Sequence, residues 1–308
     1  MKLGGKLVEC VPNISEGRDQ TKIDAIVNEV RRASGVVLLD TDPDPDHNRT
    51  VITFVGAPEP VAEAVLRLTA KAIELIDLNK HKGEHPRMGA VDVIPFVPIK
   101  HVTMKECVEL SKQVAQKIWE RFRVPVYLYE ESATSPERKD LANIRKGEFE
   151  NFSKKIMEAD WAPDFGEREI HPTAGVVAVG ARMPLIAFNV NLGTSNLEIA
   201  KKIAKAVRHS DGGLRYVKAL AFELKERGIV QISMNMTNYK KTPLHQAFEL
   251  IKREAKRYGV AVIGSEIVGL VPQEALNQTT EYYLQLENFR SEMILEERIA
   301  QAIIQSQV

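Results

Sequence analysis

The run Val91-Asp92-Val93-Ile94-Pro95-Phe96-Val97-Pro98-Ile99 decides how the first half of the chain folds. It is almost entirely apolar, which is typical of a buried strand. Upstream of it, the sequence predicts three strands and two amphipathic helices, at residues 7–13, 20–33, 36–40, 51–55 and 58–78. With the run as the last strand, the order of elements is βαββαβ, the split βαβ arrangement of ferredoxin-like folds.

The second half of the chain repeats this order. Its strands and helices are predicted at residues 185–192, 194–208, 216–224, 229–236, 242–258 and 260–263. Further elements are predicted outside the two repeats, at residues 103–122, 124–129, 140–157, 272–286 and 292–304. We therefore predict an α/β (α+β) protein with two ferredoxin-like βαββαβ subdomains, residues 1–183 and 184–308.

The composition excludes several classes of protein. The 42 basic and 42 acidic residues balance to a net charge of 0, which argues against a nucleic-acid or membrane-surface binder. Cys10 and Cys107 are far apart and lie in apolar patterns, so we expect reduced structural thiols. The N-terminal residues lack the apolar core of a signal peptide, and no apolar run approaches the ~20 residues of a membrane span. We expect a cytoplasmic protein.

The stretch before the opening strand, His81-Lys82-Gly83-Glu84-His85-Pro86-Arg87-Met88-Gly89, is dense in titratable groups. Its His-x-x-Glu-His spacing matches one class of zinc peptidase, which needs both histidines on one helical face. Gly83 weakens such a helix, and Pro86 disfavours helical geometry at the residue before it. The sequence also places no third ligand, so we expect no metal. Two interpretations stay open, a solvated polar turn and a histidine general acid–base.

Other candidate residues lie in turns and loops. Arg87 has the geometry to hold a carboxylate in a bidentate manner, and Glu84 could orient a histidine or face solvent. Asn13, Asp42 and Arg49 could supply polar contacts to a substrate, although each alone is more typical of a turn. His171 lies in a glycine-bounded loop that could line a ligand cleft or could simply connect the two halves.

Seven segments of the chain resemble the formiminotransferase domain of the glutamate formimidoyltransferase family. One of them is Gly83-Glu84-His85-Pro86-Arg87-Met88-Gly89-Ala90. The full set, in the order of the family, is residues 7–17, 48–51, 83–90, 124–129, 161–166, 187–192 and 268–272. An ordered set over nearly the whole chain is far more specific than any single motif.

The resemblance implies transfer of the formimino group of N-formimidoyl-L-glutamate to N5 of tetrahydrofolate, with release of L-glutamate, as in histidine degradation. It implies that His85 is the proton donor, that His81 supports it, and that tetrahydrofolate is a co-substrate with no metal. It implies two ferredoxin-like subdomains with a substrate cleft between them, and a homodimer. The folate-binding residues that it implies are Gly166, Glu167, Arg168, Glu169, Ile170, His171, Pro172, Thr173, Ala174 and Gly175.

Two departures from the family keep alternatives open. The sequence ends before any cyclodeaminase part, so we expect a separate protein to perform cyclodeamination. The folate loop is more charged than expected, which leaves open a one-carbon transfer related to 5-formyltetrahydrofolate or formylglutamate, or a non-catalytic folate-binding protein. Candidates to bind the glutamate carboxylates are Arg49, Lys82, Arg87 and Arg182.

Overall fold

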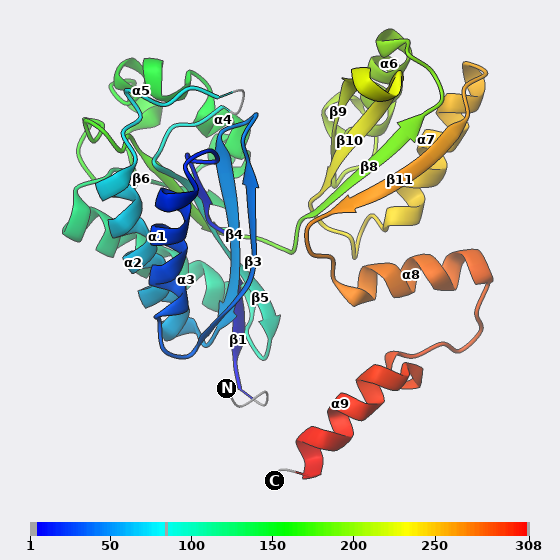
Figure 1. Cartoon of the computed structure of the whole chain (residues 1–308), viewed down its shortest axis with the longest axis horizontal. Coiled ribbons are helices and arrows are strands. Elements are labelled where there is room, and N and C mark those ends of the chain that lie inside the picture. Colours follow the sequence, from blue (N-terminus) through cyan, green and yellow to red (C-terminus); the bar gives the residue numbers. More distant parts are fainter. Residues whose placement is uncertain (1–4, 84–85, 307–308) are drawn as a thin grey trace. The chain divides into compact units, whose positions relative to one another are not determined.

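The computed structural model describes residues 5–83 and 86–306, and the chain divides into two compact units, Met1–Arg182 and Met183–Val308. Each unit contains one β-sheet with helices packed on it, so the prediction of an α/β fold is confirmed (Figure 1). No helix in the described ranges combines the length and the apolar character needed to cross a bilayer.

The first unit is built on a seven-stranded sheet. Its strands are β1 (Leu7–Cys10), β2 (Asn13–Ile14), β3 (Val36–Asp44), β4 (Arg49–Gly56), β5 (Val91–Lys100), β6 (Val126–Glu130) and β7 (Val177–Ala181). Its α-helices are α1 (Gln20–Arg31), α2 (Pro58–Leu75), α3 (Met104–Phe122), α4 (Leu141–Arg145) and α5 (Glu148–Lys155). The short β7 lies between β5 and β6 and runs parallel to both.

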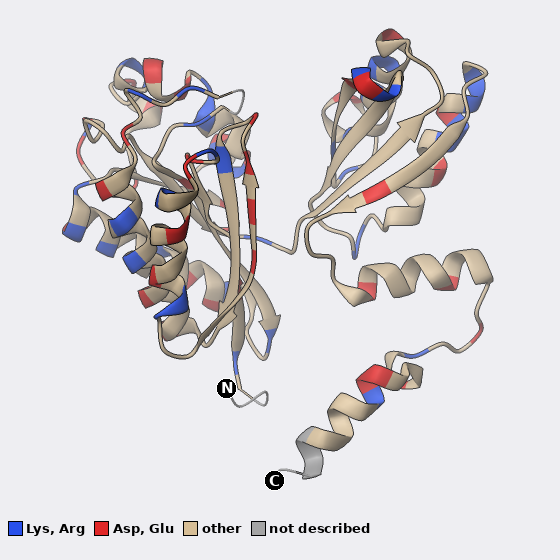
Figure 2. Ribbon diagram, viewed as in Figure 1, with Lys and Arg blue, Asp and Glu red and all other residues tan. Residues whose placement is uncertain are grey.

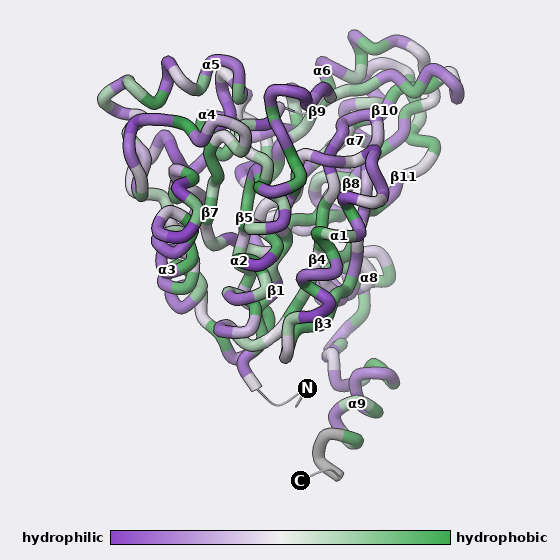
Figure 3. The backbone as a smooth tube through the Cα atoms, turned by 60° about the vertical axis from the view of Figure 1, so that its left-hand side comes forward, coloured by the Kyte–Doolittle hydropathy of each residue, from purple (hydrophilic) through white to green (hydrophobic). Residues whose placement is uncertain are grey.

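Alternating residues of β6 and β7 pack on two different layers of helices. Val126 and Leu128 join the core formed with α1, α2 and α3, whereas Tyr127 and Tyr129 pack with residues of α4 and α5. This alternation is the period of two that a strand imposes on its side chains. Figure 3 shows β5 and β7 as hydrophobic stretches, in keeping with strands that are covered on both faces.

Three expectations for the first unit were wrong in detail, and one strand was not predicted. The strand expected at 7–13 is divided into β1 and β2 at Pro12, which has no backbone N–H to donate, although both parts keep the same register with β4. The single helix expected at 140–157 is broken at Gly147, whose φ of +97° is incompatible with a continuing helix. Asp42 lies within β3, opposite Val51, and not in the following turn. Strand β7 was missed.

The second unit has a four-stranded sheet in the order β11-β8-β10-β9. Its elements follow the predicted order βαββαβ: β8 (Ile186–Leu192), α6 (Leu197–Val207), β9 (Val217–Leu224), β10 (Ile229–Met236), α7 (Leu244–Arg257) and β11 (Val262–Val268). The last strand is longer than expected, because β11 pairs with β8 as far as Val268. Helices α8 (Gln273–Leu284) and α9 (Leu295–Ser306) follow.

Candidate active site

The loop that begins at His81 is seated on the turn between β3 and β4. The side-chain amide of Asn48 donates a hydrogen bond to the Lys82 carbonyl oxygen (2.9 Å). The Asn48 carbonyl oxygen accepts one from Nε2 of His81 (2.8 Å). A Cβ atom added to Gly83 would lie 2.4 Å from the His47 carbonyl oxygen, so only glycine fits at this point of the loop.

His81 and Arg87 join the two ends of the loop. The Nε–H of Arg87 donates to Nδ1 of His81 (2.9 Å). Because Nε2 of His81 donates to Asn48, the ring is the neutral tautomer that carries its proton on Nε2. Burial lowers the pKa of His81, which also favours the neutral ring. Both ring nitrogens are therefore engaged by groups of the protein.

Arg87 is buried, and its guanidinium binds two carboxylates of α5. Its terminal nitrogens donate to the two carboxylate oxygens of Glu150 (2.6 and 3.0 Å), and one of them also donates to Glu148 (3.1 Å). These hydrogen bonds lower the pKa of Glu150. A terminal nitrogen of Arg87 also donates to the His81 backbone carbonyl oxygen (3.3 Å). The contact between Arg87 and a substrate carboxylate stays a prediction.

Three of the predicted substrate-binding residues share one face of the sheet. Asn13 and Asp42 both stand opposite Val51, and Arg49 is two residues before Val51 on the same strand. Residues two apart on a strand point to the same face, and Ile52, on the other face, is fully buried in the core. Asn13, Asp42 and Arg49 thus lie on the face turned away from α1 and α2.

The charges on this face are mixed. The acidic residues Asp42 and Asp44 of β3 lie beside Arg49, the first residue of β4, which is paired with Asp44. Figure 2 shows acidic residues in red on β3 and a basic residue in blue on β4. Burial lowers the pKa of Arg49, and the nearby carboxylate of Asp44 partly opposes this effect. Burial would raise the pKa of Asp44, but hydrogen bonds from the backbone and ring of His47 lower it overall. The face therefore presents both carboxylate and guanidinium groups near neutral pH.

The segment that follows the loop is held by the buried carboxylate of Asp92. Its Oδ1 accepts from the Met88 backbone N–H (2.8 Å), and its Oδ2 accepts from Nε of Arg145, at the end of α4 (2.7 Å). The Ser15 hydroxyl donates to the Gly89 carbonyl oxygen (2.7 Å). Elements that are far apart in the sequence therefore converge where the loop joins β5.

The predicted folate loop lies directly beside this segment. The Val176 backbone N–H donates to the Met88 carbonyl oxygen (2.9 Å), and the Ala90 N–H donates to Ala174 (3.0 Å). The Leu78 N–H donates to Thr173 (2.9 Å), which connects the same loop to the residues before His81. The structure thus brings residues 171–176 next to both flanks of the loop predicted to be catalytic.

A tight turn shapes the end of the predicted folate loop. His171 and Gly175 exchange two backbone hydrogen bonds (2.9 and 3.0 Å), and Nδ1 of His171 accepts from the Ala174 N–H (3.0 Å). Nδ1 is therefore unprotonated, and burial lowers the pKa of this ring as well. Earlier in the loop, Gly166 has a φ of +125°, a conformation that favours glycine.

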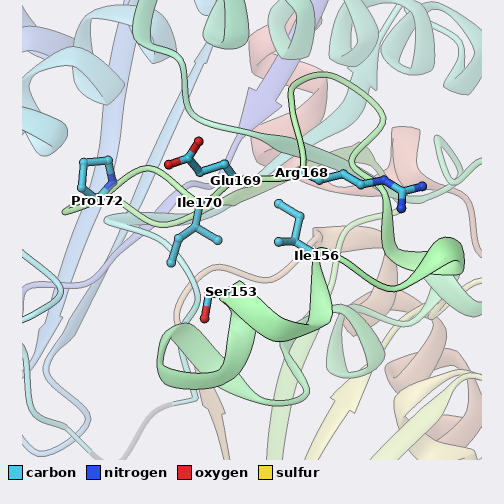
Figure 4. Close-up of a pocket in the computed structure, with 6 residues that line it drawn as sticks. All are labelled: Ser153, Ile156, Arg168, Glu169, Ile170 and Pro172. Carbon is cyan, nitrogen blue, oxygen red and sulfur yellow. The ribbon is translucent and has the colours of Figure 1, made fainter.

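The predicted folate loop also lines a pocket of about 360 Å³ against α5 and the residues after it (Figure 4). In Figure 4 the side chains of Ile156 and Ile170 point toward one another, and Arg168 extends away from Ser153. The residues that line this pocket are Ser153, Ile156, Arg168, Glu169, Ile170 and Pro172. The pocket is therefore lined by apolar side chains, Ile156 and Ile170, and by the exposed charged residues Arg168 and Glu169.

The remaining predicted residues are placed as follows. Lys82 is exposed, and only its backbone carbonyl is anchored to Asn48. Arg182 follows β7 and interacts electrostatically with Glu9 and Tyr129, so it lies away from the loop 81–87. The predicted proton donor His85 and its neighbour Glu84 lie outside the described residues. Within the part of the chain that is described, no group of three or more metal-ligating side chains occurs.

Sequence reasoning missed two residues that organise this region. Asp92 is the one charged residue of the apolar run 91–99, and a lone charge in a buried strand is a signal of a specific partner. Asn48 has a φ of +50°, and asparagine is enriched in that conformation, so its place after an acid-rich turn is a second signal. Nothing in the sequence indicates Arg145 as the partner of Asp92.

Two family descriptions match almost the entire chain. Residues 7–182 match the formiminotransferase domain, N-terminal subdomain, and residues 187–307 match the formiminotransferase domain. The chain belongs to the formiminotransferase family. A glutamate formimidoyltransferase of Streptococcus pyogenes serotype M1 is 57% identical over 92% of this chain and 95% of its own. The glutamate formimidoyltransferase of Thermoplasma acidophilum is 50% identical over 96% of this chain and 98% of its own.

The formiminotransferase family also includes longer relatives. The formimidoyltransferase-cyclodeaminase of Dictyostelium discoideum is 48% identical over 92% of this chain, which spans 54% of that relative. The region compared is therefore about half of the bifunctional protein. The predicted resemblance to the formiminotransferase family is confirmed.

Proposed function

We propose that this protein is a glutamate formimidoyltransferase, which moves the formimino group of N-formimidoyl-L-glutamate to N5 of tetrahydrofolate and releases L-glutamate. The observation that carries the proposal is the high identity to proteins of that name over nearly the full length of both chains. The geometry of the first unit supports it, since Asn48, the residue before Arg49, anchors the loop that begins at His81, and residues 173–176 are hydrogen-bonded to both flanks of that loop.

In the proposed reaction, the N5 lone pair attacks the amidine carbon and forms a tetrahedral intermediate. The bond from this carbon to the glutamate nitrogen then breaks, and that nitrogen takes its proton from the imidazolium of His85. The proton lost by N5 restores the imidazolium for the next cycle. An amine leaves poorly unless it is protonated, so the reaction needs a proton donor at this nitrogen.

The structure suggests how other residues contribute to this reaction. Asn13, Asp42 and Arg49 are the proposed polar contacts to substrate, and residues 166–175 are the proposed folate contacts. His81 already has both ring nitrogens bound to protein groups, so we assign the proton transfer to His85. We further propose a cytoplasmic homodimer, whose product is the substrate of a cyclodeaminase.

The test compares His85→Ala with His209→Ala, a change of an exposed histidine in the second unit. With tetrahydrofolate and formimidoylglutamate, H85A should lose turnover by about 100-fold or more, because general acid catalysis typically contributes 10²–10⁴-fold. H209A should retain full activity. Equal activity of H85A and the unmodified protein would remove His85 from the mechanism.

The same assay separates the alternative functions. Formylglutamate with tetrahydrofolate, or 5-formyltetrahydrofolate with L-glutamate as the acceptor, tests for formyl transfer. Turnover of a formyl donor with none of formimidoylglutamate would favour that reaction. Tight binding of tetrahydrofolate without turnover of either donor would favour a non-catalytic folate-binding protein.

A further inference from the structure

Asn48 connects three separate segments of the first unit. Its side-chain amide donates to Lys82, its side-chain oxygen accepts from the Gly17 backbone N–H (2.9 Å), and its backbone oxygen accepts from His81. The residue is 7% exposed and has a φ of +50°. Each of its three polar groups is thus committed to a different contact, two of them in the loop that starts at His81.

The loop is closed by a second contact at its base. Arg87 donates to His81, so the end of the loop is bound to its beginning, and the beginning is bound to Asn48. The carboxylates of α5 hold Arg87 from its other side. We call Asn48, His81 and Arg87 the loop frame. The frame joins residues 81, 82 and 87, which precede and follow Glu84 and His85 in the sequence.

The contact between turn and loop is too close for substitution on either side. A Cβ atom added to Gly83 would lie 2.7 Å from Cβ of Asn48, and one added to Gly17 would lie 2.6 Å from the Arg49 backbone. Two glycines therefore let the backbones reach the distance at which Asn48 forms its hydrogen bonds. Asn48 is a buried polar residue, and two of its three hydrogen bonds described above go to the loop.

We propose that Asn48 is a positioning residue for the transfer reaction, because it anchors His81 and Lys82, at the start of the segment whose sequence contains the proposed proton donor. This inference rests on the proposed function. A general acid must lie within hydrogen-bond reach of the leaving nitrogen, and a displacement of about 1 Å costs on the order of 100-fold in rate. Asn48 acts through the loop and does not itself touch substrate.

Two variants remove different parts of the contact. Asn48→Asp has almost the same shape, tolerates a positive φ and keeps the acceptor for Gly17, but it places a carboxylate oxygen against the Lys82 carbonyl. Asn48→Gly keeps the backbone conformation and the carbonyl that binds His81, but it removes both side-chain hydrogen bonds. The matched controls are Asn288→Asp and Asn288→Gly, since Asn288 also has a positive φ (+60°) and is exposed.

Steady-state kinetics of the full-length protein test the proposal. Both Asn48 variants should lower kcat by about 10- to 100-fold, with the KM values of tetrahydrofolate and formimidoylglutamate changed by less than about twofold. The Asn288 variants should behave like the unmodified protein. Unchanged kcat in N48D and N48G would overturn the proposal, as would a lower melting temperature with the same kcat per folded molecule.

Hydrogen exchange separates this proposal from the proposed function. Peptides that cover residues 78–90 should exchange faster in N48D, because the loop loses an anchor, while peptides of the second unit should not change. If the unmodified protein does not turn over formimidoylglutamate, the proposed function fails and exchange still tests the frame. An N48D protein that exchanges like the unmodified protein in this segment would then overturn the frame as well.

Discussion

Burial and short hydrogen bonds determine the protonation states of residues around the loop 81–87. His81 shows this most clearly, since its neutral tautomer is required by a donor on one side and an acceptor on the other. Protonation of Nδ1 would set two donors, His81 and Arg87, against each other. The imidazolium form of His81 is therefore incompatible with the loop frame.

This incompatibility predicts a pH dependence of stability. Burial lowers the pKa of His81 below its ordinary value of 6.5. The unfolded chain then binds a proton at a higher pH than the folded one, so the free energy of unfolding should fall as the pH decreases below about 6.5. Denaturant unfolding measured between pH 7.5 and pH 5 should show that the free energy of unfolding depends less on pH in His81→Asn than in the unmodified protein. An identical slope in H81N and the unmodified protein would contradict the prediction.

At the scale of elements, the break between α4 and α5 determines where Glu148 and Glu150 lie. Gly147 and Glu148 both have positive φ values, which turn the chain so that α5 starts beside Arg87. The Phe149 backbone N–H donates to the Arg87 carbonyl oxygen (2.9 Å), which adds a direct link between this helix start and the loop. A continuous helix would not place the two carboxylates there.

Gly147→Ala should therefore lower both stability and activity. A non-glycine residue at this φ costs about 1–2 kcal/mol, and any relaxation of the turn moves the carboxylates away from Arg87. Gly228→Ala is the matched control, because Gly228 also has a positive φ (+62°) with open space around it, in the hairpin of the second unit. Chemical denaturation should show similar losses for both variants, while kcat should fall in G147A alone. If G147A and G228A had equal kcat values, the position of α5 would not matter for activity.

The elements that could be predicted from the sequence are those with long periodic patterns. Apolar spacing gave α1, α2 and α3 to within a few residues, because one face of each helix is buried. Strand β7 is too short and too rich in small residues to carry such a pattern. The link from Asp92 to Arg145 is a tertiary contact across 53 residues, and no local pattern encodes it.

At the scale of the whole molecule, the two units have separate hydrophobic cores. Ile23 belongs to a core made only of residues from the first unit, and Ile203 belongs to one made only of residues from the second. A cavity in one core should therefore destabilise that unit first.

Ile23→Ala and Ile203→Ala test this independence. Each should cost its own unit about 2–5 kcal/mol, the usual range for such a truncation in a core. Hydrogen exchange resolved by peptide should show faster exchange of strands β1, β4 and β5 in I23A, and of β8 and β10 in I203A. Faster exchange of both sheets in either variant would show that the chain unfolds as one cooperative body.

The environment of Trp161 has a practical consequence. The ammonium of Lys155 lies 3.8 Å from the centroid of the Trp161 indole ring. The backbone carbonyl oxygen of Trp161 accepts a hydrogen bond from the Tyr127 hydroxyl (2.5 Å). The protein has only one other tryptophan, Trp119 in α3. A Trp119→Phe protein would thus keep a single emitter, a few residues before the proposed folate loop. Its fluorescence would give a label-free optical signal with which to follow pterin occupancy in real time.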